Sequence, residues 1–303
     1  MPDELYEALA GQLSHTVMLD NKECYLMSAD ILKLAAFSDG DQGGNPAGVW
    51  IGEALPEDNT MQRIAAEVGF SETAFAAPLD DGWRVRYFSP LAEVPFCGHA
   101  TIALGAALAA RNGDGVFKLQ LNQAQITVEG HAQGQLVSAA LQSPPTHSQL
   151  ADEALVDEAL ALFGYRRDEL DLCIPPARIN GGAGHLVLAL NSREALRAMR
   201  YDQTAGHALM VRENWATIVL VFAESEQSFH TRNPFAFGGV YEDPATGAAT
   251  AALAGYLRDI GWPHGGVIDI LQGEDMGSPS RLRAEITDQP GASIRVSGMA
   301  RYL

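Results

Sequence analysis

The sequence of 303 residues predicts an α+β fold made of two similar halves, each enclosing one buried helix. Two related segments indicate this duplication. Residues 95–101 (PFCGHAT) lead into 102–108 (IALGAAL), and residues 243–250 (DPATGAAT) lead into 251–257 (AALAGYL). Each segment is a turn with a proline and a glycine that opens into a helix of small, uncharged residues. A helix that is apolar on every side is buried on every side, and at about ten residues neither helix is long enough to span a membrane.

The remaining elements are mostly strands, which favours an α+β order over a regular β-α-β series. Turn residues at 39–46 (DGDQGGNP) separate the first two strands, and apolar residues three and four apart predict a helix at 61–68. The other elements expected in the first half are strands at 31–37, 48–51, 72–77 and 83–88, then the first buried helix and several strands to about 141. A proline-rich stretch at 143–148 (SPPTHS) is the best candidate for a linker.

The second half repeats this mixture of strands and short helices. The elements expected there are a helix at 152–163, strands at 173–179 and 185–190, a helix at 192–200, strands at 216–222 and 228–231, the second buried helix, and strands at 267–271, 281–286 and 293–296. Residues 1–30 read as an N-terminal extension. Their acidic start and lack of a long apolar run argue against a secretory leader.

Composition excludes several classes of function. With 38 acidic and 20 basic residues the formal charge is −18, which argues against binding to nucleic acid or to anionic membrane surfaces. A small anionic substrate remains compatible with this negative charge, because backbone dipoles can bind an anion locally. The three cysteines, Cys24, Cys97 and Cys173, are far apart and form no CxxC pair, which fits a reducing, cytoplasmic location. Neither metal-ligand spacing nor a nucleotide loop is present, so we expect no metal and no cofactor.

Two residues in the first half are candidates for proton transfer. Glu72 lies between apolar neighbours in residues 70–75 (FSETAF), and a carboxyl group in such surroundings retains its proton more readily, as general acid–base catalysis near neutral pH requires. The alternative is a solvent-exposed glutamate at the end of a strand. His99 follows Gly98 at a helix start and is placed to orient or protonate an anion, although a packed or capping histidine gives the same pattern.

The second motif supplies a counterpart. Asp243 precedes Pro244, and Thr246 precedes Gly247, so Asp243 is either an ordinary N-cap or a site residue. Two glycine-containing helix starts that face each other would cradle one carboxylate with their backbone N–H groups. Glu72, His99 and Asp243 would then line the gap between them.

Cys97 suggests a different chemistry. A cysteine beside a helix N-terminus is expected to have a lowered pKa and to be nucleophilic or basic. A racemase with two thiol bases would need a second cysteine at the matching place, which holds Ala245. The sequence therefore disfavours a thiol pair and leaves open a racemase or epimerase that uses Cys97 with a non-thiol partner.

Eight motifs, in order, resemble the phenazine-biosynthesis PhzF-like family across residues 31–303. They are 44–49 (GNPAGV), 71–75 (SETAF), 86–90 (RYFSP), 93–101 (EVPFCGHAT), 184–187 (GHLV), 242–247 (EDPATG), 272–273 (QG) with 276–280 (MGSPS), and 295–300 (RVSGMA). The resemblance implies a diaminopimelate epimerase-like fold: two halves, each a barrel-like, mostly antiparallel sheet around a central helix. It places residues 31–143 with 291–303 in the first domain and 144–290 in the second, and it implies a homodimer.

The resemblance also implies an activity, which is cofactor-free isomerisation of a dihydro-hydroxyanthranilate. In this family a glutamate at the Glu72 position moves the proton, and residues at the His99 and Asp243 positions assist. Binding of the small carboxylate substrate is implied for Gly98 and Gly247, and for Asn45 and Ala248. Ala248 stands where the family often has serine, and Ser278 stands where arginine is common. The resemblance therefore does not imply that this chain acts on the dihydro-hydroxyanthranilate itself. A non-catalytic binding or interaction protein on the same fold is the alternative from another class.

Overall fold

The computed structural model describes residues 31–133 and 136–303, so the predicted N-terminal extension at 1–30 lies outside the described residues. The first half of the chain forms β1 (Leu32–Ala36), β2 (Asn45–Ile51), α2 (Asp58–Val68), β3 (Thr73–Leu79), β4 (Gly82–Phe88), β5 (Glu93–Val94), α3 (Gly98–Asn112), β6 (Gly115–Gln120), β7 (Gln125–Gln133) and β8 (Leu136–Pro145).

The second half begins with β9 (His147–Leu150), α4 (Glu153–Phe163), η1 (Arg167–Glu169), β10 (Ala177–Asn180), β11 (Gly184–Ala189), α5 (Arg193–Arg197), α6 (Gln203–Glu213), β12 (Thr217–Ala223) and β13 (Ser228–Pro234). It continues with η2 (Ala236–Gly238), β14 (Glu242–Asp243), α7 (Gly247–Asp259), β15 (Val267–Gln272), η3 (Glu274–Met276), β16 (Ser280–Glu285) and β17 (Ser293–Tyr302).

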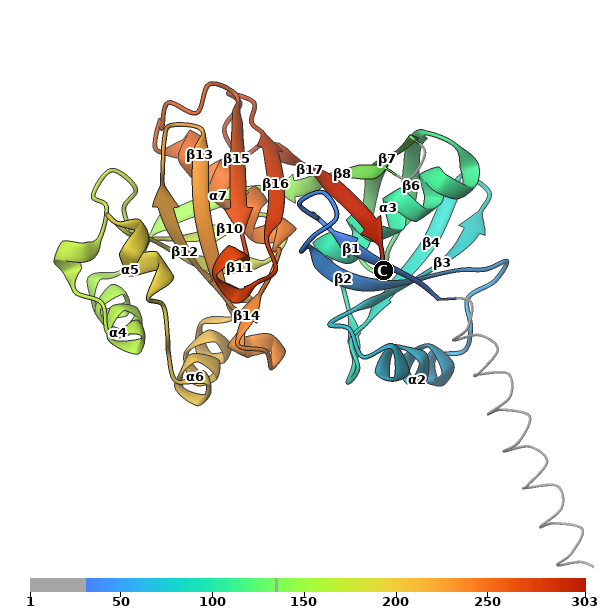
Figure 1. The fold of residues 1–303 in the computed structure, drawn as a ribbon, viewed down its shortest axis with the longest axis horizontal. Helices are drawn as coiled ribbons and strands as arrows, with labels where there is room; N and C mark the ends of the chain where they lie inside the picture. The colour runs from blue at the N-terminus through green and yellow to red at the C-terminus, as the bar shows by residue number, and fades with distance from the viewer. Residues whose placement is uncertain (1–30, 134–135) are drawn as a thin grey trace, which may run out of the picture.

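Eight strands close into a barrel, which lies at one end of the molecule (Figure 1). Around it, neighbours pair in the order β1, β2, β3, β4, β6, β7, β8 and β17, and β17 returns to β1. Helix α3 packs against seven of these strands, and its residues are buried from Gly98 to Ala109. Small residues make this contact close: a Cβ added to Gly130 of β7 would lie 2.2 Å from the carbonyl oxygen of Gly105 in α3.

The other end of the molecule is a curved sheet in the order β9, β10, β11, β12, β13, β15 and β16. Strand β16 pairs with β17, which joins this sheet to the barrel. Helix α7 packs against β9, β10, β11, β16 and β17. On the opposite face, the leucines of β11 form a second core with α4, α5 and α6. The central strands are thus apolar on both faces, which explains their long hydrophobic runs.

Two differences from the sequence prediction concern the start of the second half. Residues 143–148 are not a free linker: β8 and β9 occupy most of them, and the Ser143 hydroxyl accepts a 2.9 Å hydrogen bond from the backbone N–H of Ile294. The strand expected at 173–179 begins only at Ala177, because Asp171 accepts a hydrogen bond from the N–H of Cys173 in a local turn and two prolines follow.

Two further differences concern helix α6, which was not predicted, and strand β17, which was predicted too short. The sequence did not predict α6, whose apolar residues are not gathered on one face, although Asp202 caps it by accepting from the N–H of Ala205. Strand β17 continues to Tyr302, beyond the expected end at 296, because its first part pairs with β16 and its last part with β1. No helix among residues 31–133 and 136–303 has the length and apolar character to cross a membrane.

Candidate active site

The N-termini of α3 and α7 meet between the two sheets. A Cβ added to Gly98 would lie 3.5 Å from both the amide nitrogen of Ala248 and the Cα of Gly247. Neither N-cap residue, Cys97 or Thr246, donates or accepts a side-chain cap. The free N–H groups and positive ends of two helices therefore converge on one place, which suits an anion.

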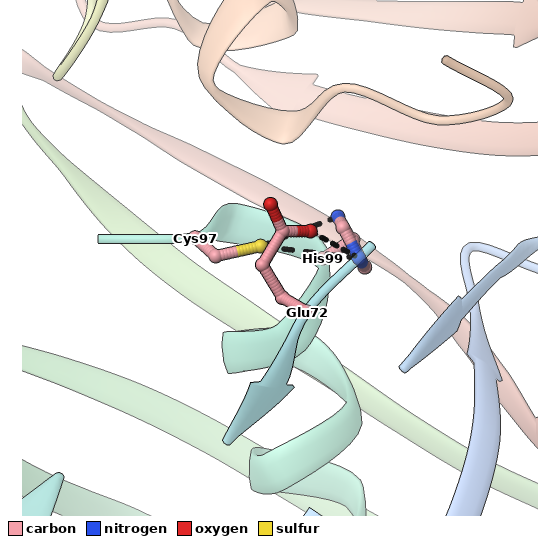
Figure 2. A group of neighbouring side chains, drawn as sticks. All are labelled: Glu72, Cys97 and His99. Atoms are coloured by element: carbon pink, nitrogen blue, oxygen red, sulfur yellow. Dashed lines mark hydrogen bonds and ion pairs between the residues drawn. The ribbon is translucent and has the colours of Figure 1, made fainter. Parts of the chain in front are cut away.

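Three side chains from the first half cluster beside this place (Figure 2). Glu72 immediately precedes β3, and Cys97 and His99 come from the start of α3. His99 Nε2 lies 3.4 Å from Glu72 Oε2, and His99 Nδ1 lies 3.3 Å from Cys97 Sγ. The Ser71 hydroxyl is a further partner of Nε2, at 3.3 Å. The imidazole therefore lies between the two other groups, with a hydrogen-bond contact to the Cys97 thiol and an ion-pair contact to the Glu72 carboxyl group.

Glu72 and His99 are both buried, with residue exposures of 9% and 6%. Glu72 is therefore not the exposed strand-end glutamate that was the alternative for it. Its Oε2 is fully enclosed and has no hydrogen-bond partner. A buried acceptor without a donor is costly and is available to a ligand that brings one.

The expectation of a lowered pKa for Cys97 is wrong. Burial, and next the negative charge of Glu72, raise the pKa of the Cys97 thiol well above its usual value. The helix N-terminus does not compensate for these effects in this buried residue, of which 8% is exposed. Cys97 is consequently a protonated thiol near neutral pH, which is the opposite of an activated nucleophile.

Asp243 faces the cluster from the second half. Its Oδ1 accepts from Asn45 Nδ2 at 2.7 Å, and its Oδ2 accepts from the Thr246 hydroxyl at 2.5 Å. Burial raises the pKa of Asp243 to about 6, although the charge of His99 and the hydroxyl of Thr246 act in the opposite direction. This carboxyl group therefore exchanges its proton close to neutral pH.

Two amide side chains hold the turn that carries Asp243. Asn45, at the start of β2, also donates to the carbonyl of Ala245 at 3.0 Å, so it joins the two halves of the chain. Gln272 donates to the carbonyl of Asp243 at 2.7 Å and accepts from the N–H of Thr246 at 3.1 Å. Ser278 donates to the carbonyl of Gly44. These contacts make Asn45 and Gln272 positioning residues for the second helix start.

A cavity of about 260 Å³ connects these groups. It is lined by residues of both halves: Glu72, residues 94–99, Gly182, Ala183, His185, Ala216, Thr217, Phe235, Phe237, Asp243 and residues 246–248. None of these is lysine or arginine, so an anion in the cavity would have to bind to backbone N–H groups and to uncharged or imidazole donors. Asn45 does not line the cavity; the structure places it behind Asp243.

The sequence reasoning assigned no role to His185. Its Nδ1 lies 2.8 Å from the Thr217 hydroxyl, its Nε2 has no partner among the described residues, and burial lowers its pKa to about 3. The signal was present as strand alternation, because His185 shares the inner face of β11 with the buried Val187 and Ala189.

A second, larger groove of about 660 Å³ lies elsewhere, along β15, β16 and β17. Its arginines are already paired: Arg281 with Asp39, Arg283 with Asp269, and Arg295 with Glu129 and Glu285. The smaller cavity is the better candidate because two of its buried polar atoms, Glu72 Oε2 and His185 Nε2, make no hydrogen bond among the described residues.

Comparisons with known proteins identify the family of this chain. A family model described as phenazine biosynthesis-like protein matches residues 34–303. An uncharacterized isomerase of Mesorhizobium japonicum is 33% identical over 85% of this chain and 91% of its own. A trans-2,3-dihydro-3-hydroxyanthranilate isomerase of Pseudomonas aeruginosa is 32% identical over 87% and 93%. A PhzF-family protein of Bacillus anthracis superposes with a TM-score of 0.79 at 21% identity, over 90% of this chain and 96% of its own.

The fold extends to amino-acid racemases, since a probable proline racemase of Agrobacterium radiobacter superposes with a TM-score of 0.61 at 11% identity, over 90% of each chain. The curated relatives carry isomerase names, and isomerase is the enzyme class that the comparisons support. The chain belongs to the phenazine biosynthesis-like, or PhzF, family.

Proposed function

We propose that this protein is a cofactor-independent isomerase that moves a proton between two carbon atoms of a small carboxylate. The observation that carries the proposal is Glu72, a buried carboxyl group whose Oε2 has no hydrogen-bond partner, at the edge of a cavity beneath two helix N-termini. A carboxyl group in this setting can take a proton from one carbon and return it to another.

The neighbouring groups have separate roles in this proposal. The N–H groups at Gly98, Gly247 and Ala248 bind the substrate carboxylate and stabilise negative charge that develops next to it. His99 orients Glu72 through its 3.4 Å contact. Asp243, with its pKa of about 6, is the second group able to exchange a proton with the substrate.

The rival enzyme reaction, epimerisation by Cys97, has less support. The thiol is protonated near neutral pH for the reasons given above, and the corresponding residue of the second motif is the buried Ala245. Unchanged activity in a Cys97→Ser variant would dismiss this reaction. A non-catalytic binder would instead hold a carboxylate tightly and exchange none of its carbon-bound protons with solvent.

We also propose that the two halves of the chain are counterpart units that repeat one order of strand pairings. In each half an antiparallel pair is followed by a parallel pair, β2 with β3 and β11 with β12. Each buried helix then follows a two-residue strand and precedes a second parallel pairing, β4 with β6 and β13 with β15. This repetition supports two counterpart units with the cleft between them. The homodimer and the cytoplasmic location stay predictions, and light scattering would test the first.

The decisive experiment follows the proton. Wild type and Glu72→Gln are incubated in heavy water with trans-2,3-dihydro-3-hydroxyanthranilate, the compound in the name of the Pseudomonas relative, and product is followed by NMR. We expect deuterium in the product of the wild type and a loss of at least about a hundredfold in rate for the variant. Glu53→Gln, on the surface, is the matched control. Normal turnover by folded Glu72→Gln would remove Glu72 from the mechanism.

A further inference from the structure

Glu72, Cys97 and His99 bring three kinds of metal-ligand atom together. Their carboxylate oxygen, sulfur and imidazole nitrogen all lie within 4.8 Å of one another, and Figure 2 shows the three side chains pointing at one another. All three residues are buried. The spacing of Cys97 and His99, two residues apart at a helix start, is short enough for both to reach one ion.

The observed separations are close to those of a tetrahedral zinc site. Zinc bonds of about 2.0–2.3 Å to nitrogen, oxygen and sulfur place neighbouring ligand atoms roughly 3.4–3.6 Å apart. His99 Nε2 lies 3.4 Å from Glu72 Oε2 and 3.9 Å from Cys97 Sγ. Small side-chain rotations are therefore sufficient to bring the three ligand atoms around one ion.

Beside the helix N-termini that suit an anion, the cavity wall also has groups that suit a cation. Asp243 adds a second carboxyl group to the cavity wall, while no lysine or arginine lines the cavity. Glu72 Oε2 is enclosed without a hydrogen-bond donor. A divalent ion would be a stronger positive partner for this oxygen than the imidazole that lies 3.4 Å away.

We propose that Glu72, Cys97 and His99 form an inhibitory site for a thiophilic divalent cation such as Zn²⁺. Binding breaks the S–H bond of Cys97, releases its proton to solvent and forms an S–metal bond. The ion occupies the lone pairs of Glu72 and His99 and so prevents them from exchanging protons with a substrate. The site does not depend on the isomerase proposal, because binding requires no substrate.

Cobalt provides a spectroscopic probe, since Co²⁺ bound to a thiolate shows a sulfur-to-metal charge-transfer band in the near ultraviolet. The parent protein for this experiment is a variant with Cys24→Ser and Cys173→Ser, in which Cys97 is the only thiol. We expect Co²⁺ to produce the band and Zn²⁺ to abolish it by competition. Adding Cys97→Ser removes the band, whereas adding Glu72→Gln keeps it and weakens Co²⁺ binding at least tenfold.

Circular dichroism and thermal melts establish that each variant folds. The Glu72→Gln variant tests the site even if Cys97→Ser does not fold. The proposal is overturned by the absence of the band in the parent protein, by its persistence in Cys97→Ser, or by unchanged Co²⁺ affinity in Glu72→Gln. Failure of the isomerase proposal would leave all three spectra as expected, so the two failures are distinguishable.

Discussion

Burial decides the charge of individual side chains around the cleft. It raises the pKa of Asp243 to about 6 and that of the Cys97 thiol well above its usual value, and it lowers the pKa of His185 to about 3. Each shift favours the uncharged form, as desolvation requires. The cleft therefore holds few charges for its number of polar groups, and a substrate carboxylate meets less repulsion than the formal charges suggest.

Asp243 makes stability depend on pH in a defined direction. Because its folded pKa of about 6 exceeds the ordinary value of 3.8, its contribution is fully present below about pH 4 and is lost as pH rises through 6. A shift of this size corresponds to roughly 2–3 kcal/mol. Asp243→Asn should therefore become more stable relative to wild type by that amount between pH 4 and pH 7, measured by urea unfolding. A constant difference, like that expected for the surface control Asp80→Asn, would contradict the assignment.

Cys97 should resist alkylation. A protonated, buried thiol reacts slowly because the thiolate is the nucleophile, whereas Cys173 is exposed. With iodoacetamide at pH 7.5, we expect peptide mass spectrometry to find Cys173 modified at least ten times faster than Cys97. Equal rates would mean that Cys97 is an activated thiol and would support the rival hypothesis of epimerisation by Cys97.

At the scale of elements, the space for a carboxylate between the two helix starts depends on the absence of a side chain at Gly98. A methyl group there would lie 3.5 Å from the Ala248 nitrogen, which is ordinary contact for the fold but occupies the space that a carboxylate oxygen needs. Gly98→Ala should retain the melting temperature and weaken binding of a small carboxylate such as benzoate at least tenfold by calorimetry. Gly115→Ala, where no atom lies within 4 Å, is the control. Unchanged binding in folded Gly98→Ala would place the carboxylate elsewhere.

The elements also show which features a sequence can predict. Both buried helices were predicted because their composition is a local property: small apolar residues on every side. The pKa of Cys97 was predicted with the wrong sign, because the helix start is local whereas the burial and the Glu72 charge come from the tertiary structure. His185 was left without a role for the same reason, since its unpartnered nitrogen is known only once β11 and β12 are paired.

At the scale of the whole molecule, the cleft exists because segments far apart in the chain are fastened together. Strand β17 pairs with β16 of one sheet and with β1 and β8 of the other. Within the cleft, Asn45 donates to Asp243, 198 positions away in sequence, and to the carbonyl of Ala245. The sequence motifs placed Asn45 among substrate-binding residues, but no local pattern indicates that its partner is Asp243.

This cross-connection should be measurable as an energetic coupling. Asn45→Ala leaves a buried carboxylate oxygen of Asp243 without its donor, which costs about 1–3 kcal/mol, and it should raise the pKa of Asp243 further because the Asn45 bond lowers it. In a double-mutant cycle of Asn45→Ala with Asp243→Ala, urea unfolding should give a coupling of about 1–2 kcal/mol. Asn122→Ala, at an exposed hydrogen bond to Glu93, should show no coupling to Asp243→Ala. Additive effects of Asn45 and Asp243 would mean that the second helix start is positioned without Asn45.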